Sequence, residues 1–473
     1  EVPERTTPDA DFREERPAPA PERAFKVPQA KRFKLSNGLP VLLVESRRLP
    51  LVSVDLYVKA GGSANPKDRA GLADLTAGML DEGTKTRTAP QISETIEQLG
   101  ASLQTNAGWD FSSVSVSALS DNIGQALEVW ADVIVNPTFD PKELERVRNN
   151  LLAALQRRKD SPPAVASLVL ARVLFGETHP FGWPNNGTED SVKAVTADEL
   201  RKFHATHYRP GNAVLVVSGD IGEADVRAKI EPLLKGWTNK GTPGLRLARP
   251  LAAKKTRIVL VDKAGAPQSS IRLGLPGVER KTPDYHKLLV MNEILGGGFR
   301  RLDLDLREKK GWTYGARSSF EMRRFPGPWA AGGEFIAQHT TDAVKALIGH
   351  VRAMRDGDVS DEELEEAKSG IIKAFPARFA TPSSTASQLA AVALYELPAN
   401  ELETFTAKIG AVTKQDVRKM AQKYLDAERL SIVVVGDQRT HLADLRQIAE
   451  VELRDVDGKV LKADSASAAA PTP

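Results

Sequence analysis

Apolar and polar residues change their spacing several times along the chain. Between Val52 and Val58 apolar residues alternate with polar ones, which is the two-residue period of a half-buried strand. The spacing then becomes helical, and four apolar residues share one face: Leu72, Leu75, Met79 and Leu80. Asn37-Gly38, between two apolar runs, predicts a hairpin with a type I′ turn. Strands and helices mix without the regular alternation of a doubly wound sheet, so the pattern predicts an α+β fold.

The sequence also repeats itself. Segment 194–202 resembles 411–419, and at the same offset of 217 residues (411 minus 194) segment 216–220 matches 433–437. Each copy combines a helix start, a helix and a strand that ends in Gly-Asp. A repeat that holds one offset indicates a duplicated domain, and one large domain with chance similarity is the alternative.

We therefore predict two homologous halves, each an antiparallel-rich mixed sheet packed with helices. The halves are 25–239 and 256–460, and a linker rich in Gly, Pro and Lys joins them at 240–255. Residues 1–24 and 461–473 are rich in Pro and Ala and have little to bury. They are predicted to be a disordered N-terminal extension and a disordered tail.

Composition excludes several chemistries. Apolar residues make up 41% and charged residues 27% of the chain, which is ordinary for a globular protein, and a net charge of +3 gives no global field for nucleic acid. The lack of cysteine excludes disulfides, thiol catalysis and cysteine-ligated zinc. Only seven histidines occur, and no two have HxxxH spacing. Apolar runs such as 389–395 are far shorter than the roughly 18 residues that span a bilayer.

The start of the chain bears on its compartment. It begins at Glu1, so we expect a mature or trimmed form. A Pro/Ala-rich leader is typical of exported bacterial proteins, which favours the periplasm, with the cytoplasm as the alternative.

Several motifs resemble those of one family. Two-halved zinc metallopeptidases of the pitrilysin, insulinase and mitochondrial processing peptidase group are similar to this chain from about Phe33 to about Asp437. The resemblance is carried by these segments: Gly61–Ser63, Gly71–Ala73 with Met79 and Gly83-Thr84, Asn212–Asp220, Leu295–Phe299 and Leu306–Tyr314. It implies a shell in which this chain forms one half of a clam-like enclosure.

Active members of that family carry the zinc motif H-x-x-E-H. Alignment places it on Asp74-Leu75-Thr76-Ala77-Gly78, which has neither histidine nor the general base. The family's third ligand, a glutamate, falls near Ala154, and 151–155 contain no carboxylate. Since catalytic zinc needs about three protein ligands, we expect no metal in this chain. Asp74 is expected on the exposed side of a packing helix.

The histidines and the acidic pair Asp81-Glu82 offer little alternative. His204 and His207 have helical i,i+3 spacing without a nearby carboxylate at ligand spacing, and His179 is expected in a structural loop. The acidic pair is expected at a solvated helix end.

The resemblance implies roles for residues in the second half. Family members place an Arg and a Tyr seven residues apart, and Arg307 and Tyr314 have that spacing. A guanidinium and a phenol can hold the scissile carbonyl and stabilise its oxyanion, and we expect this catalytic role. A surface ion pair with a strand tyrosine is the alternative.

The glycine-rich stretch has two interpretations as well. Gly296, Gly297, Gly298 and Phe299 resemble the family's loop that contacts substrate, or they form a plain helix C-cap. The stretch is about one residue shorter than the usual family spacing, which leaves the placement of Arg300 and Arg301 open.

Together these features predict the non-catalytic subunit of a heterodimeric zinc metallopeptidase. A homologous partner would carry H-x-x-E-H and the zinc, and this chain would hold no cofactor. Extended peptides are the expected substrates, bound as an added edge strand. The alternatives are a scaffold protein of a larger complex and a stand-alone peptide-binding module.

Overall fold

The computed structural model describes residues 10, 25–238, 241, 243–250 and 252–461. The predicted extension 1–24 and tail 461–473 lie almost wholly outside the described residues, as does part of the predicted linker.

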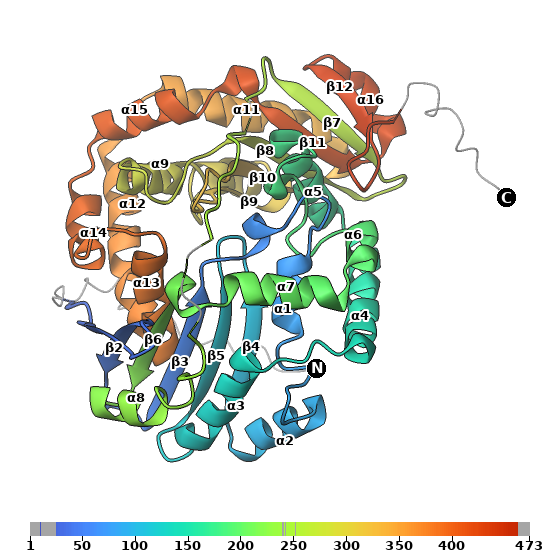
Figure 1. Ribbon diagram of the computed structural model, residues 1–473. Coiled ribbons are helices and arrows are strands. Elements are labelled where there is room, and N and C mark those ends of the chain that lie inside the picture. Colours follow the sequence, from blue (N-terminus) through green and yellow to red (C-terminus); the bar gives the residue numbers. More distant parts are fainter. Residues whose placement is uncertain (1–9, 11–24, 239–240, 242, 251, 462–473) are drawn as a thin grey trace, which may run out of the picture.

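Each half of the chain builds one six-stranded mixed sheet (Figure 1). The first contains β1 (Lys31–Lys34), β2 (Pro40–Glu45), β3 (Leu51–Val58), β4 (Ser102–Ala107), β5 (Ser112–Leu119) and β6 (Ala213–Gly219). The second contains β7 (Arg257–Asp262), β8 (Gln268–Pro276), β9 (Thr313–Phe320), β10 (Pro328–Ile336), β11 (Ser431–Gly436) and β12 (Glu450–Arg454). The orders are β1-β2-β6-β3-β5-β4 and β12-β7-β11-β8-β10-β9.

The two sheets share one topology. Five strands of each follow the same sequence of neighbours, with β2–β6 and β7–β11 parallel and the next three pairs antiparallel. The repeated segments form matching helices, α7 (Ala197–His207) and α15 (Lys414–Tyr424), each begun by a threonine capping box. The predicted α+β class with two helix-packed sheets is confirmed.

Helices cover both sheets. In the first half they are α1 (Leu72–Gly78), α2 (Ala89–Gln98), α3 (Ile123–Val135), α4 (Pro141–Lys159), α5 (Pro162–Phe175), α6 (Glu189–Ala194), α7 and α8 (Glu223–Lys229). In the second they are α9 (Tyr285–Gly296), α10 (Arg301–Asp303), α11 (Thr340–Asp356), α12 (Asp361–Ala374), α13 (Pro382–Leu394), α14 (Glu401–Gly410), α15 and α16 (Gln438–Arg446). None of the helices in the described residues is long and apolar enough to cross a membrane.

The halves exchange helices. α5, from the first half, packs on β8 and β11 of the second sheet, and α13, from the second half, packs on β3 and β6 of the first. Gly274 on β8 permits this contact, since a Cβ there would come within 2.7 Å of Leu170 Cδ1 on α5. Each sheet therefore buries one face against a helix of the other half, so the described parts of the halves form one continuous body (Figure 1).

A second contact between the halves is polar. Asp110 Oδ2 accepts hydrogen bonds from the Arg324 backbone N–H (2.8 Å) and the Tyr395 hydroxyl (2.9 Å). The Arg323 guanidinium lies 4.5 Å from the Trp109 ring and 4.4 Å from the Phe181 ring. The loop between β9 and β10 is thereby held against the first half.

The first hairpin corrects one expectation. β1 and β2 pair as predicted, but the turn is not type I′. Gly38 N–H donates to Leu35 C=O at 2.9 Å and only Gly38 (φ 87°) has a positive φ, as in a type I turn closed by a glycine bulge. Asn37 stays in ordinary backbone space because its amide binds Leu234 C=O and Trp237 C=O, both at 3.2 Å.

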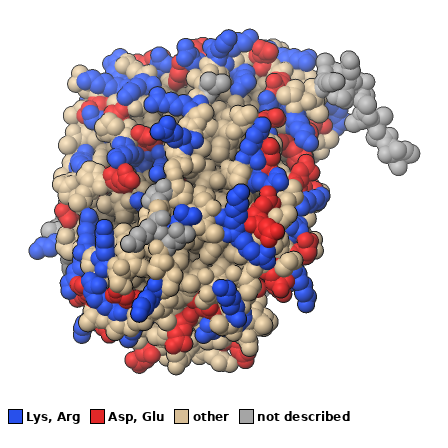
Figure 2. Space-filling view, viewed as in Figure 1, with Lys and Arg blue, Asp and Glu red and all other residues tan. Residues whose placement is uncertain are grey.

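The surface carries both charges. Figure 2 shows basic and acidic side chains interspersed over the visible face, without a broad region of one sign. This agrees with the small net charge of +3.

Candidate functional site

The helix that carries the zinc motif in the family is α1, and here it is a packing element. It follows Gly71, whose φ of 90° and closeness to Asn186 C=O (2.9 Å from a Cβ) require glycine. Its first turn is fixed by the Ala73 N–H, which donates to Asn65 Oδ1 at 2.8 Å. Ala77, at the position of the family's general base, is only 1% exposed.

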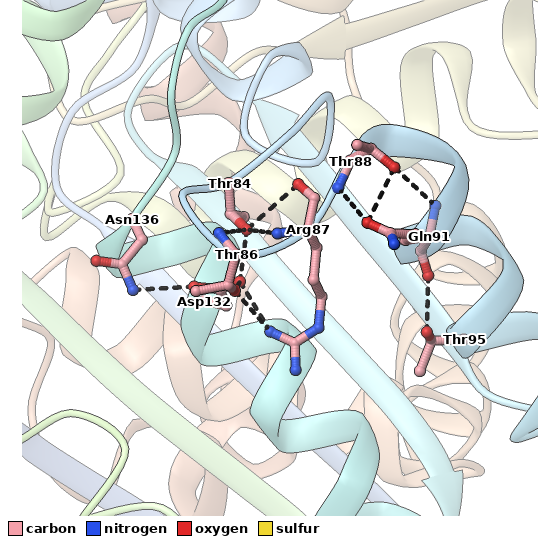
Figure 3. Close-up of polar contacts among 8 residues, drawn as sticks. All are labelled: Thr84, Thr86, Arg87, Thr88, Gln91, Thr95, Asp132 and Asn136. Atoms are coloured by element: carbon pink, nitrogen blue, oxygen red, sulfur yellow. Dashed lines mark hydrogen bonds and ion pairs between the residues drawn. The ribbon is translucent and has the colours of Figure 1, made fainter.

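The loop after α1 is also structural. Thr84, Thr86 and Arg87 donate side-chain hydrogen bonds to Asp132 Oδ2 on α3, at 2.5, 2.6 and 2.8 Å (Figure 3). Asn136 Nδ2 donates to Asp132 Oδ1 at 2.9 Å. This network explains why a threonine follows Gly83 without giving it a chemical role.

Asp74 is less exposed than expected. It lies with Gly78 on the least buried side of α1, but α1 packs against α7, β4 and β5, and Asp74 is only partly exposed. Burial raises the pKa of its carboxyl to about 6. The helical pattern marks the apolar face, but neighbours distant in sequence also cover part of the polar one.

The residues present do not fit zinc. Asp74, Ala77 and Gly78 on α1 supply one carboxylate, and the facing segment 151–155 of α4 is Leu-Leu-Ala-Ala-Leu. No group of three His, Cys, Asp or Glu side chains within the described residues could hold a metal ion. The first half therefore offers no ligand set for catalytic zinc.

The candidate histidines have structural partners. His204 Nε2 lies 2.9 Å from Ile134 C=O, and burial lowers the pKa of His204 to about 4. Burial also lowers the pKa of His207 to about 4, and its ring packs 4.4 Å from Phe203. His179 Nδ1 accepts from the Phe181 N–H at 3.0 Å, which closes a local turn.

Arg307 and Tyr314 lie at the surface of the second half. Arg307 is on a π-helical turn, Leu304–Lys309, a rare conformation that recurs at functional sites. Its side chain is 40% exposed, and its guanidinium lies 5.2 Å from the Phe299 ring and 3.3 Å from Glu308. Tyr314, on the edge strand β9, is 89% exposed.

The glycine stretch ends α9 and starts an exposed loop. Gly296 is packed so closely on β9 that a Cβ would come within 2.4 Å of the Ser318 backbone N, and Gly297 is the C-cap. Phe299 adopts a φ of 55° and is 60% exposed. Both interpretations of this stretch are therefore compatible with its geometry. Gly298 has open space where a Cβ would be.

Two arginines and one aspartate anchor this loop. Arg300 pairs with Glu366, and Arg301 binds Glu363 through two bonds of 2.6 and 2.8 Å, so both are tied to α12. Asp303, which sequence reasoning missed, is 1% exposed; it accepts from the Phe299 N–H (3.2 Å) and the Ala316 N–H on β9 (2.9 Å). The one signal for this anchoring role in the sequence was the position of the Asp303 carboxylate, four residues after Phe299.

Duplicated α+β halves that exchange helices, with ligand-poor α1 in one half and an exposed Arg/Tyr pair in the other, define a peptidase-like fold without its metal site. Two family models match the chain: "Insulinase (Peptidase family M16)" over 41–179 and "Peptidase M16 inactive domain" over 194–371. The chain belongs to the M16 family, which includes insulinase and pitrilysin.

Individual relatives agree with this. A crystal structure described as the peptidase M16 inactive domain from Pseudomonas fluorescens is 30% identical, with a TM-score of 0.80, over 86% of this chain and 98% of that chain. A "non-peptidase homolog" from Helicobacter pylori is 26% identical over 85% of this chain and 92% of its own length. An "uncharacterized zinc protease" from Bacillus subtilis is 25% identical over 72% and 81%.

Proposed function

We propose that the chain is the non-catalytic subunit of a two-chain zinc metallopeptidase. A homologous partner would carry the H-x-x-E-H motif and its zinc, and this chain would supply Arg307 and Tyr314. The observation that carries the proposal is a contrast between the halves. The motif positions on α1 hold one half-buried carboxylate and no histidine, whereas the second half keeps both donors, Tyr314 fully exposed and Arg307 partly exposed.

The chemistry of the two donors supports the division of labour. An arginine or tyrosine can stabilise the oxyanion of a tetrahedral intermediate, but neither generates a nucleophile from water. The proposal therefore needs a second chain for water activation. Extended peptides would bind by strand addition, for which the sheets offer β4 and β9 as edge strands.

The test is reconstitution with a homologue that has an intact motif. We expect the mixture to contain zinc by mass spectrometry and to cleave a casein-derived peptide, and the chain alone to do neither. Arg307→Ala or Tyr314→Phe should lower kcat of the mixture by about 100-fold with zinc content unchanged.

Matched substitutions away from the pair serve as controls. Arg352→Ala on α11 and Tyr285→Phe on α9 remove the same chemical groups and should leave kcat within a factor of about two. Cleavage by the isolated chain at the rate of the mixture would refute the proposal. Full activity of a mixture containing the double variant at Arg307 and Tyr314 would favour a scaffold role instead.

A further inference from the structure

A cavity of about 550 Å³ lies where the two halves meet. Its walls come from α4, α5, the segment before α1, the segment 177–191 and the turn 455–459 after β12. It is distinct from the degenerate zinc motif, since neither the α1 motif positions nor Ala154 line it. The volume falls within the range of about 300–1,000 Å³ that is typical of small-molecule sites.

One wall contains an incompletely neutralised buried cation. The Arg172 side chain on α5 is only 5% exposed, and its one ion pair among the described residues, with Glu177 at 3.4 Å, is to a side chain that is itself 72% exposed; Asp455 and Asp457 act on it from further away. Its Nε–H has no hydrogen-bond partner within the described residues. Because burial without full pairing disfavours a charged guanidinium, the pKa of Arg172 is lowered. The side chain therefore has a donor to spare for an anion.

A second arginine, Arg158 on α4, also lines the cavity. Arg158 on α4 donates to neutral acceptors, Asn186 Oδ1 at 2.9 Å and Gly187 C=O at 3.3 Å, and burial lowers its pKa also. Lys159, in contrast, is neutralised by Glu189 at 2.8 Å and Asp457 at 3.2 Å. The cavity thus combines two underpaired guanidiniums with carboxylates that would repel a second negative charge on a ligand.

The remaining walls are apolar and aromatic. The Arg172 guanidinium lies 3.3 Å from the centre of the Trp183 ring, and this stack fixes the direction of its donors. Trp109, Leu155 and Leu168 provide further apolar surface. A ligand that satisfies both parts needs one anionic group and a flat or bulky apolar body.

We propose that this cavity binds a monoanionic carboxylate with an aromatic or bulky apolar body. The carboxylate would pair with Arg172 and Arg158, and the body would lie between Trp183 and Trp109. Such a group occurs in free aromatic acids and at the C-terminal residue of a peptide. The site does not depend on the peptidase-subunit proposal, because it uses neither Arg307 nor Tyr314.

Calorimetric titration of the full chain tests the site. The probes are N-acetyl-phenylalanine, its neutral amide, 3-phenylpropanoate and inorganic phosphate. We expect an acid to bind at least about 10-fold more tightly than the amide and than phosphate, as charge-assisted hydrogen bonds to a buried arginine require. A preference for N-acetyl-phenylalanine over 3-phenylpropanoate would identify a peptide C-terminus, the reverse a free acid, and either supports the site.

Substitutions locate the binding. Arg172→Met should weaken acid binding at least about 10-fold and bring the affinities for acid and amide close together, since only the charged contact is lost. Because a buried arginine can be needed for folding, Arg158→Met is the second variant, with the melting temperature as the check. Arg352→Met on α11 is the control and should bind as the unchanged protein does.

Three results would overturn the proposal. Equal binding of acid and amide would leave only an apolar cavity, and phosphate binding as tight as that of an acid would exclude the carboxylate class. Undetectable binding of every probe at 10 mM, or unchanged binding by folded Arg158→Met and Arg172→Met proteins, would also exclude it. None of these results bears on reconstituted peptidase activity.

Discussion

Replacement of Asp74 by asparagine should stabilise the protein at neutral pH. Burial raises the pKa of this carboxyl from 3.8 to about 6. At about 1.4 kcal/mol per pH unit, the charged form costs the folded state about 3 kcal/mol. Some solvent still reaches the group, so we expect a gain of about 1–3 kcal/mol from Asp74→Asn at pH 7.5.

The pH dependence identifies the cause. Because the folded-state pKa is raised, the folded protein binds more protons than the unfolded chain between pH 3.8 and about 6. The stability of the unchanged protein therefore falls as pH rises through this window, while the Asp74→Asn protein lacks that slope. The gain should be fully present above pH 6 and vanish near pH 4.

Urea unfolding at pH 7.5 and pH 4 measures the difference in midpoint. Asp121→Asn, in an exposed turn of the same half, is the matched control and should change the midpoint little at pH 7.5. A gain of equal size at both pH values would show that hydrogen bonding or packing, not the charge, is responsible. Destabilisation at pH 7.5 would refute the reasoning.

Further substitutions test packing and charge pairing elsewhere in the chain. Glu401→Gln should cost about 1–3 kcal/mol at pH 7 in thermal unfolding, because a contact with His286 at 3.4 Å and the cations Lys408 and Arg280 lower the Glu401 pKa to about 2, an effect that solvent screening reduces; the cost should shrink as pH falls from 4.5 towards 2, where the native carboxylate also loses its charge. Gly274→Ala should lower stability by about 1–3 kcal/mol, by crowding α5, whereas Gly349→Ala in α11, with open space around it, should raise stability by about 0.5–1 kcal/mol. Asp303→Ala should cost about 2–4 kcal/mol and speed hydrogen exchange at the amides it binds, whereas unchanged exchange would contradict its anchoring role.

The duplication could be predicted from the sequence because both copies retain the same local signals. Both copies of the capped helix and the following strand kept their threonine caps and apolar spacing, and α7 and α15 begin and end at equivalent positions. The same signals could not show that α5 and α13 each pack on the sheet of the other half, since each helix has an apolar face that fits either sheet. Which sheet a helix covers depends on contacts such as that between Gly274 and Leu170, which are distant in sequence.

The site residues also fall into those whose role could be predicted from the sequence and those whose role could not. The absence of zinc ligands could be predicted because the motif requires particular residue types at fixed spacing, and Ala77 and Gly78 cannot bind metal in any fold. The covering of Asp74, the anchoring by Asp303 and the underpaired Arg172 could not be found, because burial and pairing are set by distant neighbours. The residue types in a sequence can therefore exclude a chemical role more readily than they can assign one.

The motif positions differ in burial. Ala77 is 1% exposed, whereas Asp74, Gly78 and Ala154 are partly exposed, and a Cβ at Gly78 would meet nothing within 4 Å. Ala77→Glu would therefore bury a new charge at a cost of several kcal/mol, which opposes recovery of zinc by simple substitution. In the second half, Tyr314 is 89% exposed. We propose a partner chain because this half keeps an exposed aromatic donor while the described residues hold no group of metal ligands, and we expect the zinc on that partner.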